Sequence, residues 1–449
     1  MSDPARMSAR PKLGIVGGGI AGLTTALRLA EAGCEVTLWE RGPRFGGQAA
    51  AFPVEGGNLE YFYHHLFQSD REIVALIEEL GISDHLLWLP SNVGYFANKT
   101  IYPLNGALDL LKLGLVPIWD RVRIGVVTAY LQRVRNWRRF EKITAERWLK
   151  RALGKNAYEK TLGAQLNAKF GRYQGDVAMV WFWGKIWLRT TSRKSPLEQE
   201  KLGYIKGSFN VLIDALVKGA EAAGAGLHSG AGPNKLEQND DQTWRMIFDD
   251  GSEESYDQII VTTPSPIMAR LVPALPDYYR ALLNGLVYEA AAVALLQLDR
   301  PLSDIYWLNI ADPDMPFTGV IEHTNFMPSS EYGDKHYVYL SKYLETDHPY
   351  FNLPEAEVID AYLPHLKKIN PDFDPSWVEK WWLFRERAAQ PIVTLNYSDK
   401  LPSHRTPLAN LYLANTSQIY PEDRGTNYSV RLGNQISDLV LNDLRVAAG

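Results

Sequence analysis

Three glycines near the amino terminus have the spacing of a turn that cradles a phosphate group. Gly17, Gly19 and Gly22 form a GxGxxG pattern, and Glu40 follows 18 residues after Gly22. We expect Gly17 to allow a tight turn, Gly19 to let the backbone approach a pyrophosphate, and Gly22 to allow close helix–strand packing. A carboxylate at Glu40 accepts hydrogen bonds from an adenosine ribose and repels a 2′-phosphate. These residues predict a dinucleotide site that favours NAD or FAD over NADP.

The elements around these glycines are predicted to be a strand, a turn, a helix and a second strand. Residues 12–16 read as a short buried strand, and residues 35–39 alternate like a second strand. The helix between them has one apolar face and ends near Gly33. Its free N–H groups and positive dipole would face the phosphates, so Ile20 and Ala21 are expected to contact them.

The segment after the second strand favours FAD. Residues 40–47, ERGPRFGG, resemble the extension that follows the ribose-binding acid in the amine oxidase, protoporphyrinogen oxidase and phytoene desaturase superfamily of flavoproteins. The resemblance implies that an arginine, Arg41 or Arg44, and the pair Gly46 and Gly47 run along the dinucleotide. A disulfide reductase would carry a second GxGxxG pattern, and this sequence has none.

Two later segments resemble the parts of that superfamily that return to the FAD. Near the carboxy terminus a strand (410–415), a loop (419–427) and a helix (429–444) have the expected order. An earlier strand ends in Thr262-Thr263-Pro264. The resemblance places these residues at the cofactor: Pro233 at the adenine, Thr263, Asn415, Gly425, Thr426 and Asn427. Asn415 and Thr416 stand where relatives have glycine and an acid, and Asp423 is the candidate replacement for that acid.

The resemblance implies a two-domain α/β fold. A Rossmann-type FAD-binding domain of the glutathione-reductase kind would comprise residues 1–75, 203–265 and 406–449. Residues 76–202 and 266–405 would form an interleaved α+β substrate domain facing the flavin.

Three polar residues are candidates for substrate chemistry. His64 and His65 follow the glycine pair and can act as hydrogen-bond donors or as a base, or else pack as structural histidines. Arg385, or its neighbour Arg387, can bind a carboxylate or phosphate, or else pair with Glu386. Two adjacent histidines without a second cluster do not make a metal site, so we predict no metal.

Two further segments have an open interpretation. Residues 181–187, WFWGKIW, either line a substrate cavity or belong to the core. Residues 120–139 carry six arginines and one aspartate on a predicted amphipathic helix. That helix either covers the substrate domain with a solvated basic face or rests on an anionic membrane surface.

The composition excludes several classes of protein. The chain has 449 residues and a formal net charge of −5, so it lacks the basic field that collects nucleic acid. The single cysteine, Cys34, excludes an intramolecular disulfide framework and a CxxC redox pair. The sequence contains no run of about 20 apolar residues, so we predict no transmembrane helix. We expect a cytoplasmic protein, with peripheral contact at the inner face of a membrane as an open alternative.

The function predicted from this resemblance is that of an FAD-dependent oxidoreductase. The flavin would take a hydride from a C–H bond of a small organic substrate, and oxygen or a quinone would reoxidise it. A redox-neutral flavoenzyme acting on a nucleotide sugar, similar to UDP-galactopyranose mutase, is the alternative. An FAD-stabilised binding protein is a third reading. The oligomeric state has no signal in the sequence.

Overall fold

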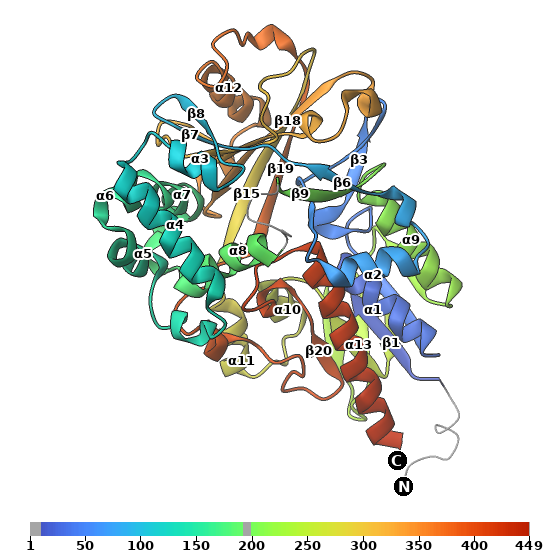
Figure 1. Cartoon of the computed structure of the whole chain (residues 1–449). Helices are drawn as coiled ribbons and strands as arrows, with labels where there is room; N and C mark the ends of the chain where they lie inside the picture. The colour runs from blue at the N-terminus through green and yellow to red at the C-terminus, as the bar shows by residue number, and fades with distance from the viewer. Residues whose placement is uncertain (1–9, 192–198, 449) are drawn as a thin grey trace.

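A five-stranded parallel sheet carries the glycine turn (Figure 1). The structure is a computed structural model that describes residues 10–191 and 199–448. The strand order is β10–β2–β1–β14–β20, which puts β1 in the middle. The strands are β1 (Lys12–Val16), β2 (Glu35–Glu40), β10 (Gly226–Ser229), β14 (Gln258–Val261) and β20 (Leu411–Leu413).

Helices cover one face of this sheet and a smaller sheet covers the other. β1 and β14 are short apolar runs that are buried on both faces, as in other covered parallel sheets. α1 (Ile20–Glu31) packs on one face between α9 (Asn210–Ala222) and α13 (Thr426–Ala448). The opposite face packs against an antiparallel sheet of β11 (Lys235–Gln238), β12 (Trp244–Ile247) and β13 (Glu253–Tyr256).

The predicted α/β fold with a Rossmann-type sheet is therefore confirmed. All five strands fall within the three segments assigned from sequence to the FAD-binding domain. Two of the proposed boundaries, at 75 and 202, pass through α2 (Arg71–Glu79) and β9 (Lys201–Ile205). The helix expected from residue 429 begins at Thr426, and the helix expected to reach residue 139 is α4 (Ile118–Arg133).

A second sheet, of seven strands, lies next to the part of the molecule that contains the parallel sheet (Figure 1). Its order is β19–β15–β18–β17–β16–β7–β8, and only β7 and β16 pair in parallel. Two long strands, β15 and β19, reach back towards the parallel sheet. The strands are β7 (Val93–Ala97), β8 (Thr100–Pro103), β15 (Tyr288–Leu298), β16 (Trp307–Ile310), β17 (Gly319–Glu322), β18 (His336–Leu344) and β19 (Val378–Pro391).

A layer of helices lies beside this second sheet (Figure 1). It comprises α3 (Ala107–Lys112), α4, α5 (Ala145–Leu153), α6 (Lys155–Lys160), α7 (Leu162–Phe170) and α8 (Met179–Thr191). On the other side α12 (Glu355–Leu366) packs against β19. Smaller elements join the two parts: β3 (Ala51–Val54) with β4 (Gly57–Glu60), and β5 (Leu66–Phe67), β9 and β6 (Leu86–Pro90). α10 (Ser265–Leu271) and α11 (Asp277–Asn284) follow the parallel sheet.

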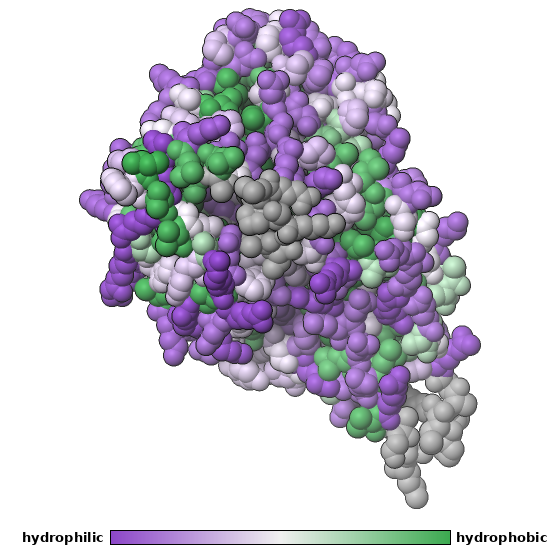
Figure 2. All heavy atoms as spheres, viewed as in Figure 1, coloured by the Kyte–Doolittle hydropathy of each residue, from purple (hydrophilic) through white to green (hydrophobic). Residues whose placement is uncertain are grey.

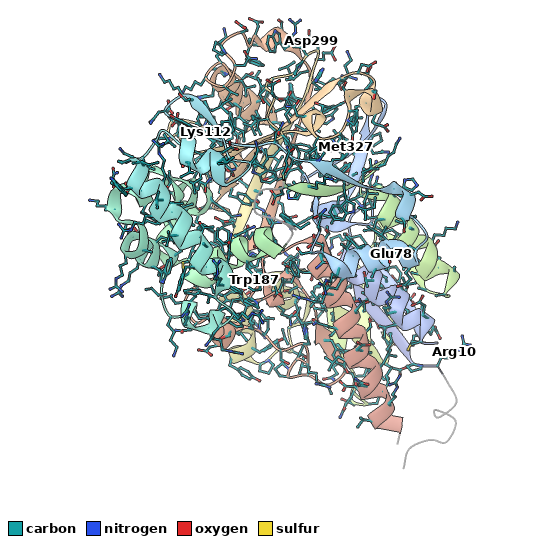
Figure 3. The ribbon with its side chains drawn as sticks, in the orientation of Figure 1. Arg10, Glu78, Lys112, Trp187, Asp299 and Met327 are labelled. Atoms are coloured by element: carbon teal, nitrogen blue, oxygen red, sulfur yellow. The ribbon has the colours of Figure 1, made fainter. Side chains whose placement is uncertain are left out.

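The aromatic run at residues 181–187 belongs mostly to the core. Trp181, Phe182 and Trp183 are buried in the cluster that holds the helical layer together. Trp187, labelled in Figure 3, stacks on Trp183 with ring centroids 5.5 Å apart. No helix within residues 10–191 and 199–448 has both the length and the apolar composition needed to cross a membrane.

Candidate functional site

The backbone at the three glycines has the geometry that their predicted roles require. Gly17 has a φ of +110°, and a Cβ there would lie 2.6 Å from Thr262 Oγ1. A Cβ at Gly22 would lie 2.0 Å from the carbonyl oxygen of Gly17, so α1 packs directly on the turn. A Cβ at Gly19 would meet nothing within 4 Å, because this residue borders an open cavity.

Two helix N-termini face the same cavity. Gly19 is the N-cap of α1, and no side chain caps the free N–H groups of that helix. The first turn of α13 reaches the cavity through Thr426 and Ser429. Neither helix has an acidic residue in its first turn, so the positive end of each dipole is available to an anion.

Glu40 is held rigidly at the end of β2. Its two carboxylate oxygens accept hydrogen bonds from the N–H groups of Gly18, at 2.7 Å, and Gly42, at 2.6 Å. Each oxygen keeps a lone pair for a ribose hydroxyl. Next to it the Arg41 guanidinium donates to the Pro233 carbonyl at 2.8 Å, which fixes the far end of the cavity.

These residues line one elongated cavity of about 360 Å³, called here the glycine-turn cavity. It runs from Arg41 and Pro233, past the turn, to the start of α13. Most of the predicted cofactor residues line it: Gly17, Gly19, Ile20, Ala21, Glu40, Arg41, Gly46, Gly47, Pro233, Thr263, Asn415, Gly425 and Thr426.

The remaining predicted cofactor residues lie elsewhere, for identifiable reasons. Arg44 donates to the Ala51 carbonyl at 3.2 Å and does not line the cavity within the described chain. Asn427 accepts from the Ile73 N–H at 3.0 Å and donates to Glu72 at 2.8 Å, so it caps α2. Asp423 pairs with Lys185 and lies in a neighbouring cavity instead.

FAD fits the glycine-turn cavity. The space at Gly19 admits a pyrophosphate against the uncapped start of α1. The hydroxyl of Thr263 is buried and has no hydrogen-bond partner among the described residues, as expected for a group that forms its hydrogen bond with a bound ligand. Asn415 supports this wall by donating to the Thr263 carbonyl at 2.9 Å.

A second cavity of about 210 Å³ adjoins the first, and we call it the inner cavity. The two share a wall made by Gln48, His64, Glu386, Arg424, Gly425 and Thr426. β19 reaches this wall, where the Gln48 amide donates to the Ala388 carbonyl at 3.1 Å. The inner cavity therefore begins where the glycine-turn cavity ends, at the start of α13.

The two histidines both line the inner cavity. The Nδ1 atom of His64 donates to the Phe62 carbonyl, which leaves Nε2 as an acceptor. Burial lowers the pKa of His64 to about 4, and the charge of Arg424 acts in the same direction. His65 packs edge-on against Trp307, and its Nδ1 lies 3.3 Å from the Tyr306 hydroxyl.

Arg385, the third catalytic candidate, is not at the site. Its guanidinium donates to the carbonyl of Leu353, on the opposite side of β19 from the cavities. Successive residues of a strand point to opposite faces, so Glu386 faces the cavities and its arginine neighbours do not. Arg387 lies over the Phe351 ring, 4.6 Å from its centroid.

The strongest electrostatic feature of the inner cavity was not predicted from the sequence. Arg424 donates to the Tyr343 hydroxyl at 3.0 Å. Burial would raise the pKa of Tyr343, but the positive charges of Lys169, Arg424 and Lys185 lower it below its usual value. Burial would likewise raise the pKa of Asp423, and the same three cations lower it to about 2.

Comparisons with known proteins identify the family. A family model described as flavin-containing amine oxidoreductase matches residues 20–422. The chain belongs to this family. It is therefore an FAD-dependent oxidoreductase, and the predicted cofactor FAD is confirmed.

Several proteins that are similar to the chain differ widely from it in sequence. The 15-cis-phytoene desaturase of an Oncidium hybrid cultivar is 24% identical over 448 residues, covering 92% of this chain and 75% of the relative. Among solved structures, reduced UDP-galactopyranose mutase has a TM-score of 0.74 at 17% identity and covers 96% of each chain. Putrescine oxidase bound to putrescine has a TM-score of 0.70 at 15% identity, over 97% of this chain and 99% of that one. The solved structures thus share the fold.

Proposed function

We propose that the protein oxidises a C–H bond of a small organic substrate held in the inner cavity. FAD, when bound, supplies the hydride acceptor, and oxygen or a quinone is the final electron acceptor. One observation carries the proposal: the cofactor cavity and a second cavity share a wall at the start of α13. A substrate in the inner cavity would lie against that end of the cofactor.

The chain's own residues would orient and desolvate the reactants. The start of α13 and Arg424 place positive charge at the shared wall, where electrons arrive during the reaction. His64 is neutral at pH 7 and offers an acceptor without adding charge. No nucleophilic side chain is needed for this chemistry.

Anaerobic mixing tests the proposed oxidation. The FAD-loaded protein is screened against amines, tetrapyrroles, polyenes and nucleotide sugars while the flavin absorbance is followed. A substrate of the proposed kind bleaches the flavin band by itself, and admitted oxygen or an added quinone restores it. A protein that takes up FAD but is bleached by none of these classes would contradict the proposal.

A redox-neutral reaction on a nucleotide sugar is the second candidate. The cations at the inner cavity favour it because they suit a phosphate group. The same experiment separates the two reactions. A redox-neutral enzyme would leave its oxidised flavin unbleached and turn over only after the flavin has been reduced.

We also propose that one face of the helical layer contacts a membrane. Among the described residues, seven of the eleven exposed large apolar side chains lie on α3 and α4, and Figure 2 shows apolar residues gathered there. They are Leu108, Leu111, Ile118, Trp119, Val122, Val126 and Tyr130. Exposed basic side chains adjoin them: Lys112 (labelled in Figure 3), Arg123, Arg133, Arg135, Arg138 and Arg139. This combination suits an anionic bilayer.

Vesicle sedimentation tests the membrane contact. Binding is expected to vesicles that contain phosphatidylglycerol and to fall when Trp119→Ser and Val126→Ser are combined, since these side chains are 80% and 63% exposed. Tyr278→Ser is the matched control, because Tyr278 is 69% exposed on α11, outside the patch. Equal binding of all three proteins would exclude this surface.

A further inference from the structure

Four cationic side chains gather where the inner cavity meets a third cavity. The third cavity, called here the outer cavity, has a volume of about 710 Å³ and shares Lys169, Lys342 and Tyr343 with the inner one. Lys185 and Arg424 complete the set at the inner cavity. We call Lys169, Lys185, Lys342 and Arg424 the cationic cluster.

The members of the cationic cluster come from four different elements. Lys169 lies at the end of α7 and Lys185 lies on α8. Lys342 lies on β18, and Arg424 lies two residues before the start of α13. Bringing like charges together from separate elements is unfavourable unless a counter-charge joins them.

Carboxylates near the cluster neutralise only part of its charge. Asp423 pairs with Lys185. Burial raises the pKa of Glu289, which lines the outer cavity, to about 8, and that of Asp70, at the inner cavity, to about 7. Glu386 adds one negative charge at the shared wall, and Glu345 in the outer cavity lies 3.9 Å from Arg172. The positive charge of the cationic cluster is therefore only partly compensated.

Lys169 and Arg424 are the cations best placed to receive a ligand. Within the described residues no carboxylate oxygen lies within 4.0 Å of either side chain's nitrogen atoms. Aromatic rings hold the Lys169 ammonium instead, 4.3 Å from the Tyr343 ring centroid and 5.2 Å from that of Trp181. Arg424 donates to the hydroxyl of the same Tyr343.

Two buried polar atoms at this position lack a partner. The Nε–H of Arg424 finds no acceptor in the part of the chain that the structure describes. The amide oxygen of Gln390, a residue that is 1% exposed and lines the inner cavity, likewise receives no hydrogen bond from the described residues, and it needs a donor on another part of the ligand. Buried groups of this kind are costly unless a ligand completes their hydrogen bonds.

We propose that the inner cavity binds an oxyanion, a carboxylate or phosphate group of the substrate, through Lys169 and Arg424. This inference rests on the function proposed above, since it defines the substrate class of that cavity. The oxyanion accepts from the Arg424 guanidinium and the Lys169 ammonium, and it anchors the rest of the substrate at the shared wall. The outer cavity, which is lined by both lysines and carboxylates, gives it a route.

Calorimetric titration of the FAD-loaded protein with ligands of matched shape tests the proposal. Benzoate and phenyl phosphate carry the two candidate oxyanions, and benzyl alcohol and benzylamine are the neutral and cationic controls. At constant ionic strength we expect at least one oxyanion to bind at least about tenfold more tightly than both controls. The tighter of the two identifies the group as carboxylate or phosphate.

Variants at Lys169 locate the binding. Lys169 lies outside the glycine-turn cavity, so Lys169→Gln leaves FAD uptake unchanged but weakens the oxyanion by about tenfold or more. Lys169→Arg keeps the charge and restores binding. Lys155→Gln is the matched control, because Lys155 is 81% exposed on α6 and lies outside all three cavities in the described chain.

The failures of the two proposals are distinguishable. A protein that binds FAD and bleaches with a substrate, yet binds benzylamine as tightly as the oxyanions, would overturn this inference alone. An unchanged oxyanion affinity in Lys169→Gln would also overturn it. Oxyanion binding without any flavin bleaching would leave this inference standing and contradict the proposed oxidation.

Discussion

A valine in place of Gly19 is the sharpest test of how the glycine turn holds FAD. Gly19 is the N-cap of α1 with φ −72° and ψ 176°, an extended conformation that valine adopts without strain. Its Cβ would meet no protein atom within 4 Å. Gly19→Val should therefore fold like the wild type, and its side chain should occupy the space that the pyrophosphate needs.

The expected loss of affinity follows from the hydrogen bonds that the valine prevents. A charge-assisted hydrogen bond between a backbone N–H and a phosphate contributes about 1.5–3 kcal/mol. Losing two such bonds at the start of α1 costs about 3–6 kcal/mol, which is about 10²- to 10⁴-fold in the dissociation constant of FAD. The free energy of unfolding of the FAD-free protein should change by less than about 0.5 kcal/mol.

The assay is titration of FAD into the FAD-free protein, followed by the quenching of flavin fluorescence. Gly106→Val is a matched control, because Gly106 is also a helix N-cap with extended backbone and nothing within 4 Å of its Cβ. It lies outside the glycine-turn cavity. Wild-type FAD affinity in Gly19→Val, or an equal loss in Gly106→Val, would refute the reasoning.

Three further predictions concern stability and protonation. Gly22→Ala should lower the free energy of unfolding, measured with urea, by about 1–3 kcal/mol, because its Cβ would lie 2.0 Å from the Gly17 carbonyl oxygen. An unchanged free energy of unfolding would show that α1 can shift to accommodate the methyl group. Burial raises the pKa of Glu60 from 4.5 to about 7, so the folded state holds this proton more tightly than the unfolded state. As the pH rises from about 4.5 to about 7, the free energy of unfolding of the wild type should thus fall by about 3 kcal/mol at most relative to that of Glu60→Gln. Free energies of unfolding that change in parallel with pH in the two proteins would contradict this. His64, with a pKa of about 4, should keep a neutral ring from about pH 5 upward in nitrogen NMR, with His64→Gln identifying its signal; protonation near pH 6.5 would contradict its burial.

Local sequence signals predicted the cofactor half of the molecule well. Residues 12–16 form β1 as expected, and the second strand extends only one residue beyond the expected 35–39. The reason is that turn geometry, apolar periodicity and helix-start chemistry act within a few residues of one another. The glycines, Glu40 and the residues after β14 therefore reach the cavity as the spacing indicates.

Side-chain partners that are distant in the sequence explain the errors. Asn427 was expected at the cofactor, but its partners Glu72 and Ile73 lie more than 350 positions away. Arg385 lies on the far face of β19, because the alternation of a strand does not say which face meets the cavity. If the face that meets the cavities is assigned one residue out of register, Arg385 is placed at the cavities instead of Glu386.

The missed cations left weaker signals. Lys185 follows Trp181 by four residues in a run that is otherwise aromatic and apolar, the spacing of side chains on one helix face. A lysine on such a face needs a partner, and Asp423 supplies it. Arg424 lies in the loop before α13 and lines two cavities. Its position there depends on how β18 and α13 pack, which the local sequence does not indicate.

The cationic cluster favours some substrate classes over others. An amine such as the putrescine in one neighbouring structure carries positive charge, which Lys169 and Arg424 would repel. A hydrocarbon substrate would bury the same cations without a counter-charge. An oxyanion removes both penalties and completes the hydrogen bonds of Arg424. The cations at the inner cavity therefore favour an oxyanion substrate over an amine or a hydrocarbon.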